Sequence, residues 1–124
     1  MRRTFLILGS LFGLFGVALG AFGAHGLKNI LTPEMLAVFE TAVRYQMYHT
    51  FAIIGVALMV EEFPAAVYAG RLFGFGILLF SGSLYALSLS GIAWFGMITP
   101  FGGFCFLAGW FVLLTSSFKI KKEN

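Results

Sequence analysis

Residues 4–24 read TFLILGSLFGLFGVALGAFGA, an apolar stretch without a single charge. A helix of this length, at 1.5 Å per residue, covers the roughly 30 Å hydrocarbon layer of a bilayer. Its glycines stand at helical spacing and include Gly9-x-x-x-Gly13 and Gly16-x-x-x-Gly20. Such glycines form a groove that lets another helix approach closely in lipid. We expect this groove to pack the protein's own helices, and association of several copies through the same groove is the alternative.

The composition of the whole chain supports a membrane location. Of its 124 residues, 60% are hydrophobic and only 10% are charged, whereas soluble domains carry about 25% charged residues. Too few charges are present to coat a soluble globule, so we expect lipid to be the solvent and a partner. The net charge of +3 comes from basic residues gathered at the two chain ends. This distribution is typical of membrane anchors and not of a nucleic-acid surface.

Four segments are candidates for membrane spans, at about residues 4–24, 45–61, 68–89 and 100–118. The second is preceded by an amphipathic helical part at 33–44, which begins with Thr32 as a potential N-cap and Pro33 at the first helical position. We therefore expect one long helix from Pro33 to about Glu61. The predicted fold is all-α, a single integral-membrane four-helix bundle covering residues 1–124. The alternative for the first segment is a secretory signal peptide, since two arginines precede it and small residues follow.

Basic residues predict the orientation of these spans, because Lys and Arg are enriched in cytoplasmic loops. With four spans, the two termini and the loop at 61–71 share one side of the membrane. That side holds six basic residues, which are Arg2, Arg3, Arg71, Lys119, Lys121 and Lys122. The other side holds Lys28 and, at most, Arg44. We therefore expect cytoplasmic termini. The tail KKEN at 121–124 also fits a dilysine retrieval pattern, but four residues are a weak signal and we favour a plain cytoplasmic anchor.

The segment ETAVRYQMYH at 40–49 places polar side chains at the entrance of the second span. Glu40 and Arg44 stand four residues apart, in the order that favours a salt bridge on a helix. In one interpretation these turns lie in the outer headgroup layer, with Arg44 on lipid phosphates and the tyrosines in the interfacial aromatic belt. In the other, the helix carries Arg44, Gln46 and His49 into the bundle, where each needs a polar partner.

Partners for such buried groups are available on the third span and at the start of the fourth, at Ser81, Ser83, Tyr85, Ser88 and Thr99. His25 ends the first span on the same side, and neighbouring glycines allow its ring to turn inward. The candidate ligand-binding residues are His25, Glu40, Arg44, Tyr45, Gln46, His49, Ser81, Ser83 and Tyr85. The candidate helix-packing residues are Gly9, Gly13, Gly16, Gly20, Gly74, Gly102 and Gly103.

The sequence gives no sign of metal, cofactor or catalytic chemistry. It contains no aspartate and no His-x-x-x-His pair, so we expect no metal site. Nucleophile elbows, phosphate loops and dinucleotide fingerprints are also absent, and the glycines of residues 4–24 lie inside an apolar span with no strand before it. We therefore expect no cofactor and no enzyme.

Four landmarks in order carry a resemblance to a known family: GAFGAHGL at 20–27, RYQMYH at 44–49, FSGSLY at 80–85 and ITPFGG at 98–103. They resemble the domain of unknown function 423 family, small multi-pass membrane proteins akin to transmembrane protein 256 of animals. The resemblance covers nearly the whole chain. It implies a bacterial inner-membrane protein, or an organellar one in a eukaryote, and it implies no activity.

Three functions follow from these observations. The first is binding of a lipid headgroup, or of another anionic small molecule, through Arg44. The second is a small oligomeric transporter, for which Glu40 and His49 are the nearest ionisable residues. The third is an accessory subunit that docks through its glycine grooves onto protein partners that the sequence does not identify. Convergence of His25, Arg44 and His49 on one cavity would favour the first two functions.

Overall fold

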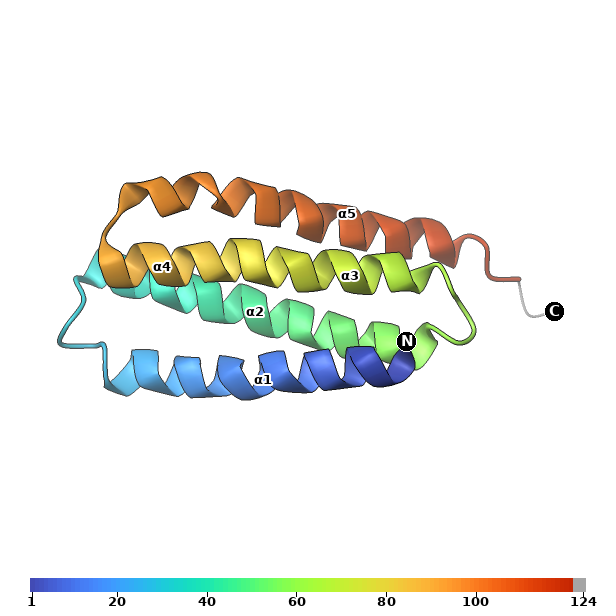
Figure 1. Ribbon diagram of the computed structural model, residues 1–124, viewed down its shortest axis with the longest axis horizontal. Coiled ribbons are helices and arrows are strands. Elements are labelled where there is room, and N and C mark those ends of the chain that lie inside the picture. Colours follow the sequence, from blue (N-terminus) through green and yellow to red (C-terminus); the bar gives the residue numbers. More distant parts are fainter. Residues whose placement is uncertain (122–124) are drawn as a thin grey trace.

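A computed structural model describes residues 1–121, so the end of the tail, Lys122 to Asn124, lies outside the described part. Four long helical segments run side by side in alternating directions (Figure 1). They are α1 (Arg2–His25), α2 (Pro33–Met59), a third segment made of α3 (Ala66–Gly76), η1 (Ile77–Ser81) and α4 (Gly82–Ser90), and α5 (Thr99–Ser117), which follows the short helix η2 (Ala93–Met97). The N-terminus and the end of α5 lie at the same end of the molecule. The expected all-α membrane fold is confirmed.

One of the four segments differs from the others in polarity. By length and composition, three segments are apolar enough to cross a membrane, namely Arg2–His25, Ala66–Ser90 and Ala93–Ser117. α2 is longer than α1, with 27 residues, but it carries the polar residues at 40–49. The expected single helix from Pro33 to about Glu61 is observed as Pro33–Met59, so this polar segment lies within one continuous helix.

Local chemistry sets the ends of the helices. Thr32 is extended (φ −60°, ψ 155°) and its side-chain oxygen accepts a hydrogen bond from the Met35 N–H at 3.2 Å, which satisfies one of the free donors at the start of α2. α4 ends before Gly91, whose φ of +71° is a left-handed conformation that glycine adopts without strain. The chain turns there and enters η2, and α5 then begins at the expected Thr99-Pro100 pair.

Glycines on α1 allow α2 to lie directly along its backbone. A Cβ atom added at any of five α1 glycines would contact or overlap a side chain of α2. The pairs are Gly9 with Ile54, Gly13 with Thr50, Gly16 with Met47, Gly20 with Val43, and Gly23 with Phe39. The groove is therefore filled by the same chain, which leaves it unavailable to a second copy.

The second hairpin uses glycine differently. A Cβ at Gly102 of α5 would overlap the backbone of Phe80 in η1, so the two segments touch backbone to backbone at this point. Gly103, the next residue, has only the Phe80 ring at 3.9 Å. Gly74 has no atom within 4 Å of an added Cβ. Of the predicted packing glycines, Gly74 and Gly103 thus lie outside the tight contacts.

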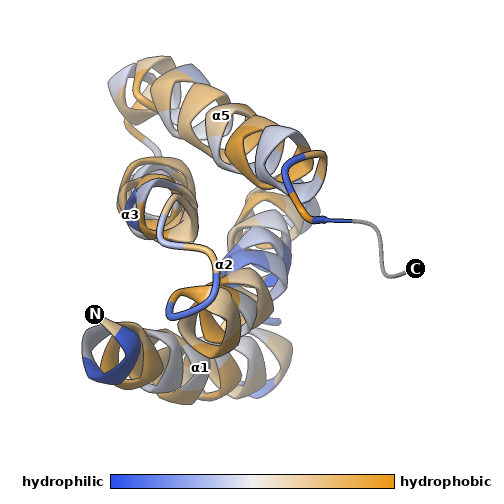
Figure 2. Ribbon diagram, turned by 90° about the vertical axis from the view of Figure 1, so that its right-hand side faces the viewer, coloured by the Kyte–Doolittle hydropathy of each residue, from blue (hydrophilic) through white to orange (hydrophobic). Residues whose placement is uncertain are grey.

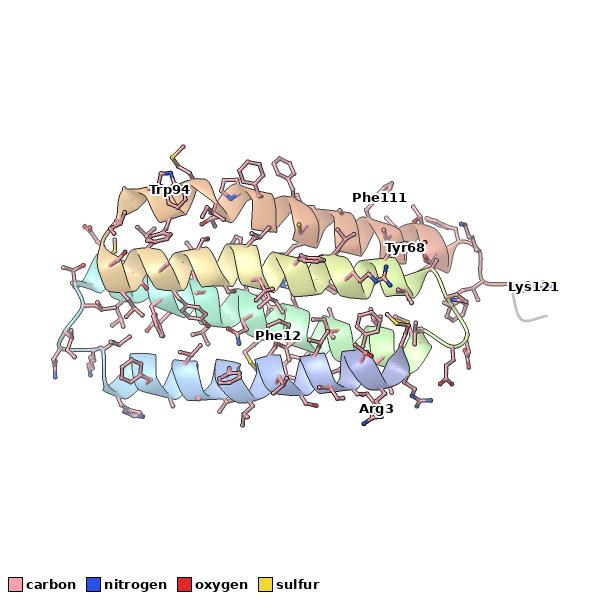
Figure 3. All side chains as sticks on the ribbon, in the orientation of Figure 1. Arg3, Phe12, Tyr68, Trp94, Phe111 and Lys121 are labelled. Atoms are coloured by element: carbon pink, nitrogen blue, oxygen red, sulfur yellow. The ribbon has the colours of Figure 1, made fainter. Side chains whose placement is uncertain are left out.

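The apolar core fills the half of the molecule near the chain termini. Its buried members are Phe5, Ile53, Val56, Ala57, Val60, Ala66, Ala69, Phe73, Ile77 and Phe106. Large apolar side chains also cover the outside, as expected in lipid. Figure 3 shows Phe111 and Trp94 pointing away from the neighbouring helices, and they are 65% and 60% exposed. The other half of the interior holds most of the polar contacts.

Seen end-on, the helices form a folded row (Figure 2). α1 packs on α2, α2 packs on the third segment, and the third segment packs on α5. α2 and the third segment therefore form the contact between the two hairpins. This arrangement leaves α2 and α5 facing each other across η1, and it sets the position of the candidate site.

We predict that Gly102→Ala destabilises the protein by about 1–3 kcal/mol, because the new methyl group meets main-chain atoms that cannot rotate away. Gly82→Ala is the matched control, since nothing lies within 4 Å of its Cβ position. Thermal unfolding in detergent, followed by circular dichroism, measures both. Equal unfolding temperatures for the two variants would contradict the backbone contact.

Candidate functional site

Gln46 connects three helices from the interior of α2. Its side chain is 3% exposed. The amide nitrogen donates to the carbonyl oxygen of Phe12 in α1 at 2.8 Å, and the amide oxygen accepts from the Tyr85 hydroxyl of α4 at 2.6 Å. Both ends of the amide therefore find partners, which removes most of the cost of placing it at membrane depth.

Serines join the third segment to its neighbours. The Ser81 hydroxyl, at the end of the π-helical turn η1, donates to the Ala42 carbonyl of α2 at 2.7 Å. The Ser83 hydroxyl lies 2.6 Å from that of Thr99 at the start of α5. Ser88 bonds within its own helix, to the Tyr85 carbonyl. Of the residues expected to pair with Arg44, Gln46 or His49, only Tyr85 does so within residues 1–121, through Gln46. Ser81, Ser83 and Thr99 instead make other contacts between helices.

His49 is held on both ring nitrogens and on one ring face. Nδ1 lies 2.8 Å from the carbonyl oxygen of Tyr45, and the Trp110 indole N–H donates to Nε2 at 3.1 Å. Because Nε2 accepts, Nδ1 carries the proton of this neutral ring. The ring stacks on Phe106 with centroids 3.5 Å apart and planes 7° from parallel. The interpretation in which α2 carries Gln46 and His49 into the interior is confirmed.

That interpretation is wrong for Arg44. Arg44 and Glu40 are both exposed, and the expected salt bridge between them is not formed. The Arg44 guanidinium donates instead to the Thr41 hydroxyl at 3.1 Å. Within residues 1–121 the salt bridge that does form joins Arg2 to Glu61 at 3.3 Å, two exposed side chains where α1 begins and α2 has ended.

His25 also lies apart from the interior cluster. It is exposed and ends α1 beyond Gly23, whereas His49 lies beside Thr50, the residue that faces Gly13. Gly13 and His25 are twelve residues apart on α1, which corresponds to about 18 Å along the helix. The convergence of His25, Arg44 and His49 on one cavity is therefore not observed. Residues 1–121 contain no group of three side chains able to hold a metal ion.

An aromatic groove of about 640 Å³ lies between α2 and α5, over η1, and is open to the outside of the molecule. It carries no charged side chain. Its lining residues are Tyr45, Tyr48, His49, Phe80, Pro100, Gly103, Phe104, Phe106, Leu107 and Trp110. We call it the α2–α5 groove. Sequence reasoning missed its α5 wall, although Gly103, Leu107 and Trp110 recur at the helical spacing that places them on one face.

Comparison with known proteins places the chain among bacterial membrane proteins of unassigned role. Residues 19–103 match the family described as Protein of unknown function (DUF423). The chain is 46% identical to a UPF0382 membrane protein of Haemophilus influenzae, over 98% of each chain. It is 44% identical to a UPF0382 membrane protein of Staphylococcus saprophyticus, over 95% of this chain and 99% of that one. It is 39% identical to the UPF0382 inner membrane protein YgdD of Escherichia coli, over 98% and 95%. No solved structure matches the chain.

We predict that Tyr85→Phe destabilises the protein by about 0.6–1.7 kcal/mol, because the Gln46 amide oxygen loses its donor at membrane depth. Tyr68→Phe is the control, since Tyr68 is 62% exposed and its hydroxyl bonds to nothing within residues 1–121. A double-mutant cycle with Gln46→Met measures the coupling in detergent unfolding experiments. Strictly additive effects of the two substitutions would contradict this interhelical bond.

Proposed function

This chain belongs to the DUF423 family of membrane proteins, as its landmarks predicted, and we propose that it binds one acyl chain of a membrane lipid in the α2–α5 groove. The observation that carries the proposal is the groove itself, which is aromatic, uncharged and open to the outside of the molecule. Ligand sites are typically apolar cavities of about 300–1,000 Å³ with a few polar groups. The α2–α5 groove has this character, with the His49–Trp110 pair at its inner end.

The length of the groove favours an acyl chain. Its α5 wall extends from Pro100 to Trp110, which corresponds to about 15 Å of helix. One leaflet contributes half of the roughly 30 Å hydrocarbon layer. The groove therefore matches the depth of a single leaflet, from the start of α5 to the level of His49 near the middle of the membrane.

The pairing of the interior polar groups favours binding over transport. Gln46, His49, Ser81 and Ser83 all have hydrogen-bond partners, and every Glu, Lys and Arg in the described part of the chain is exposed, which leaves His49 as the buried ionisable side chain there. A proton- or cation-coupled path through one chain would need an ionisable group free to exchange its proton along the way, whereas both ring nitrogens of His49 are engaged by Tyr45 and Trp110. Arg44 does not line the groove, so the proposal rests on acyl-chain contacts and not on the headgroup contact considered from sequence.

We expect Gly103→Leu to abolish lipid retention, because the space beyond its Cβ position leads into the groove and the new side chain would fill it. Native mass spectrometry of protein exchanged into mild detergent measures the outcome. The unmodified protein should retain one phospholipid per chain, and Gly82→Leu, which adds the same side chain where no atom lies within 4 Å, should retain it too. The proposal would be refuted if Gly103→Leu retained the lipid as Gly82→Leu does, or if the unmodified protein retained no lipid.

We also propose that the termini face the cytoplasm, which places the α2–α5 groove in the outer leaflet. The end of the molecule that holds the termini carries Arg2, Arg3 and Lys119, whereas the opposite loop carries Lys28. Lys and Arg favour the cytoplasmic side. In a Cys105→Ser background, Asn29→Cys should react with a membrane-impermeant maleimide on intact spheroplasts, and Glu62→Cys should react only after lysis. The reverse pattern would overturn this orientation.

A further inference from the structure

The outward face of α2 forms a continuous exposed stripe. Its residues recur every three or four positions, and each is exposed except Gly55, which is half-buried. We call it the α2 stripe: Ala37, Glu40, Arg44, Tyr48, Phe51, Gly55 and Leu58. No atom lies within 4 Å of a Cβ added at Gly55, so the stripe is open along its length. In Figure 2, part of the α2 ribbon has the colour of hydrophilic residues.

With α1 centred across the hydrocarbon layer, Arg44 and Tyr48 of the α2 stripe lie inside that layer and Glu40 lies at its edge. Tyr48 is next to the level of Thr50, which faces Gly13 at the middle of α1. Arg44 lies about 6–9 Å from this level along the helix, well inside the roughly 15 Å half-thickness of the hydrocarbon layer. Phe51 and Leu58 continue the stripe toward the other leaflet.

These groups lack adequate partners within the chain. Tyr48 is 56% exposed, and its hydroxyl makes no hydrogen bond to residues 1–121. The Arg44 guanidinium reaches only the Thr41 hydroxyl. Hydrocarbon offers no acceptor to either group, and uncompensated polar groups in this layer cost several kcal/mol. We therefore expect another molecule to cover the α2 stripe and to supply hydrogen-bond acceptors and a negative charge.

We propose that the α2 stripe is the interface of a homodimer, with a second copy of this chain as its cover. The stripe is complementary to itself, because it carries one acid and one base that do not pair within the chain. A two-fold axis along the membrane normal sets the two α2 helices parallel and face to face. Glu40 of each copy then faces Arg44 of the other, one helical turn away. Gly55 permits a close approach of the two backbones at the far end.

Charge reversal tests this pairing directly. The readout is energy transfer between copies labelled at Lys28→Cys, in a Cys105→Ser background, in phosphatidylcholine vesicles at decreasing protein-to-lipid ratio. We expect the reference protein to dimerise, and Glu40→Lys or Arg44→Glu each to weaken dimerisation at least tenfold. An equimolar mixture of these two variants should associate as well as the reference protein, because opposite charges then meet at both positions across the interface.

Two controls separate the interface from general effects on the fold. Arg71→Glu reverses an exposed charge on α3, away from the stripe, and should leave energy transfer unchanged. Gly55→Leu keeps all charges but blocks the close approach, and should weaken dimerisation, whereas Gly82→Leu should not. Circular dichroism checks that each variant is folded.

Three results would overturn the proposal. A reference protein that stays monomeric at every ratio would mean that lipid headgroups or a different protein cover the stripe. Dimerisation that survives both charge reversals would place the interface elsewhere. A mixture that fails to recover would rule out the reciprocal Glu40–Arg44 pairing.

Discussion

The bilayer offers no hydrogen bonds to the protein, and this constraint governs the placement of nearly every polar side chain. On the inner face of its most polar helix, α2, the chain meets it by pairing polar groups with those of the neighbouring helices. Gln46 bonds to α1 and α4, His49 bonds to α5, and the Ala42 carbonyl receives Ser81 of η1. Gln46, His49 and the Ala42 carbonyl thus connect α2 to α1, to the third helical segment and to α5.

Small residues make these polar contacts reachable. The α1 glycines bring the Phe12 carbonyl close enough for the Gln46 amide. In the second hairpin, Gly102 reaches the main chain of Phe80 within η1, next to the serine that bonds to α2. A π-helical turn inside a longer helix is uncommon and is often found at functional sites. Here it adjoins the α2–α5 groove, which includes Phe80 in its floor.

The fold could largely be predicted from the sequence, because hydropathy and glycine spacing are strong local signals. The Thr32-Pro33 and Thr99-Pro100 starts correspond to the observed beginnings of α2 and α5. Whether an individual polar side chain is buried or exposed was harder to predict. Burial of Gln46 and His49 follows from their depth, but the outward position of Arg44 depends on which face of α2 meets α1. Trp110 stood in an apolar run, and nothing local in that run marks it as the donor to His49.

The polarity of α2 has a consequence for how the protein is made. A segment that is less apolar than its neighbours partitions poorly into lipid when it leaves the translocon by itself. The Gln46 amide nitrogen of α2 finds its acceptor on α1, whereas the His49 ring bonds to α5 and to its own helix. Entry of α1 and α2 into the membrane as a helical hairpin would therefore satisfy this amide donor before the second hairpin arrives.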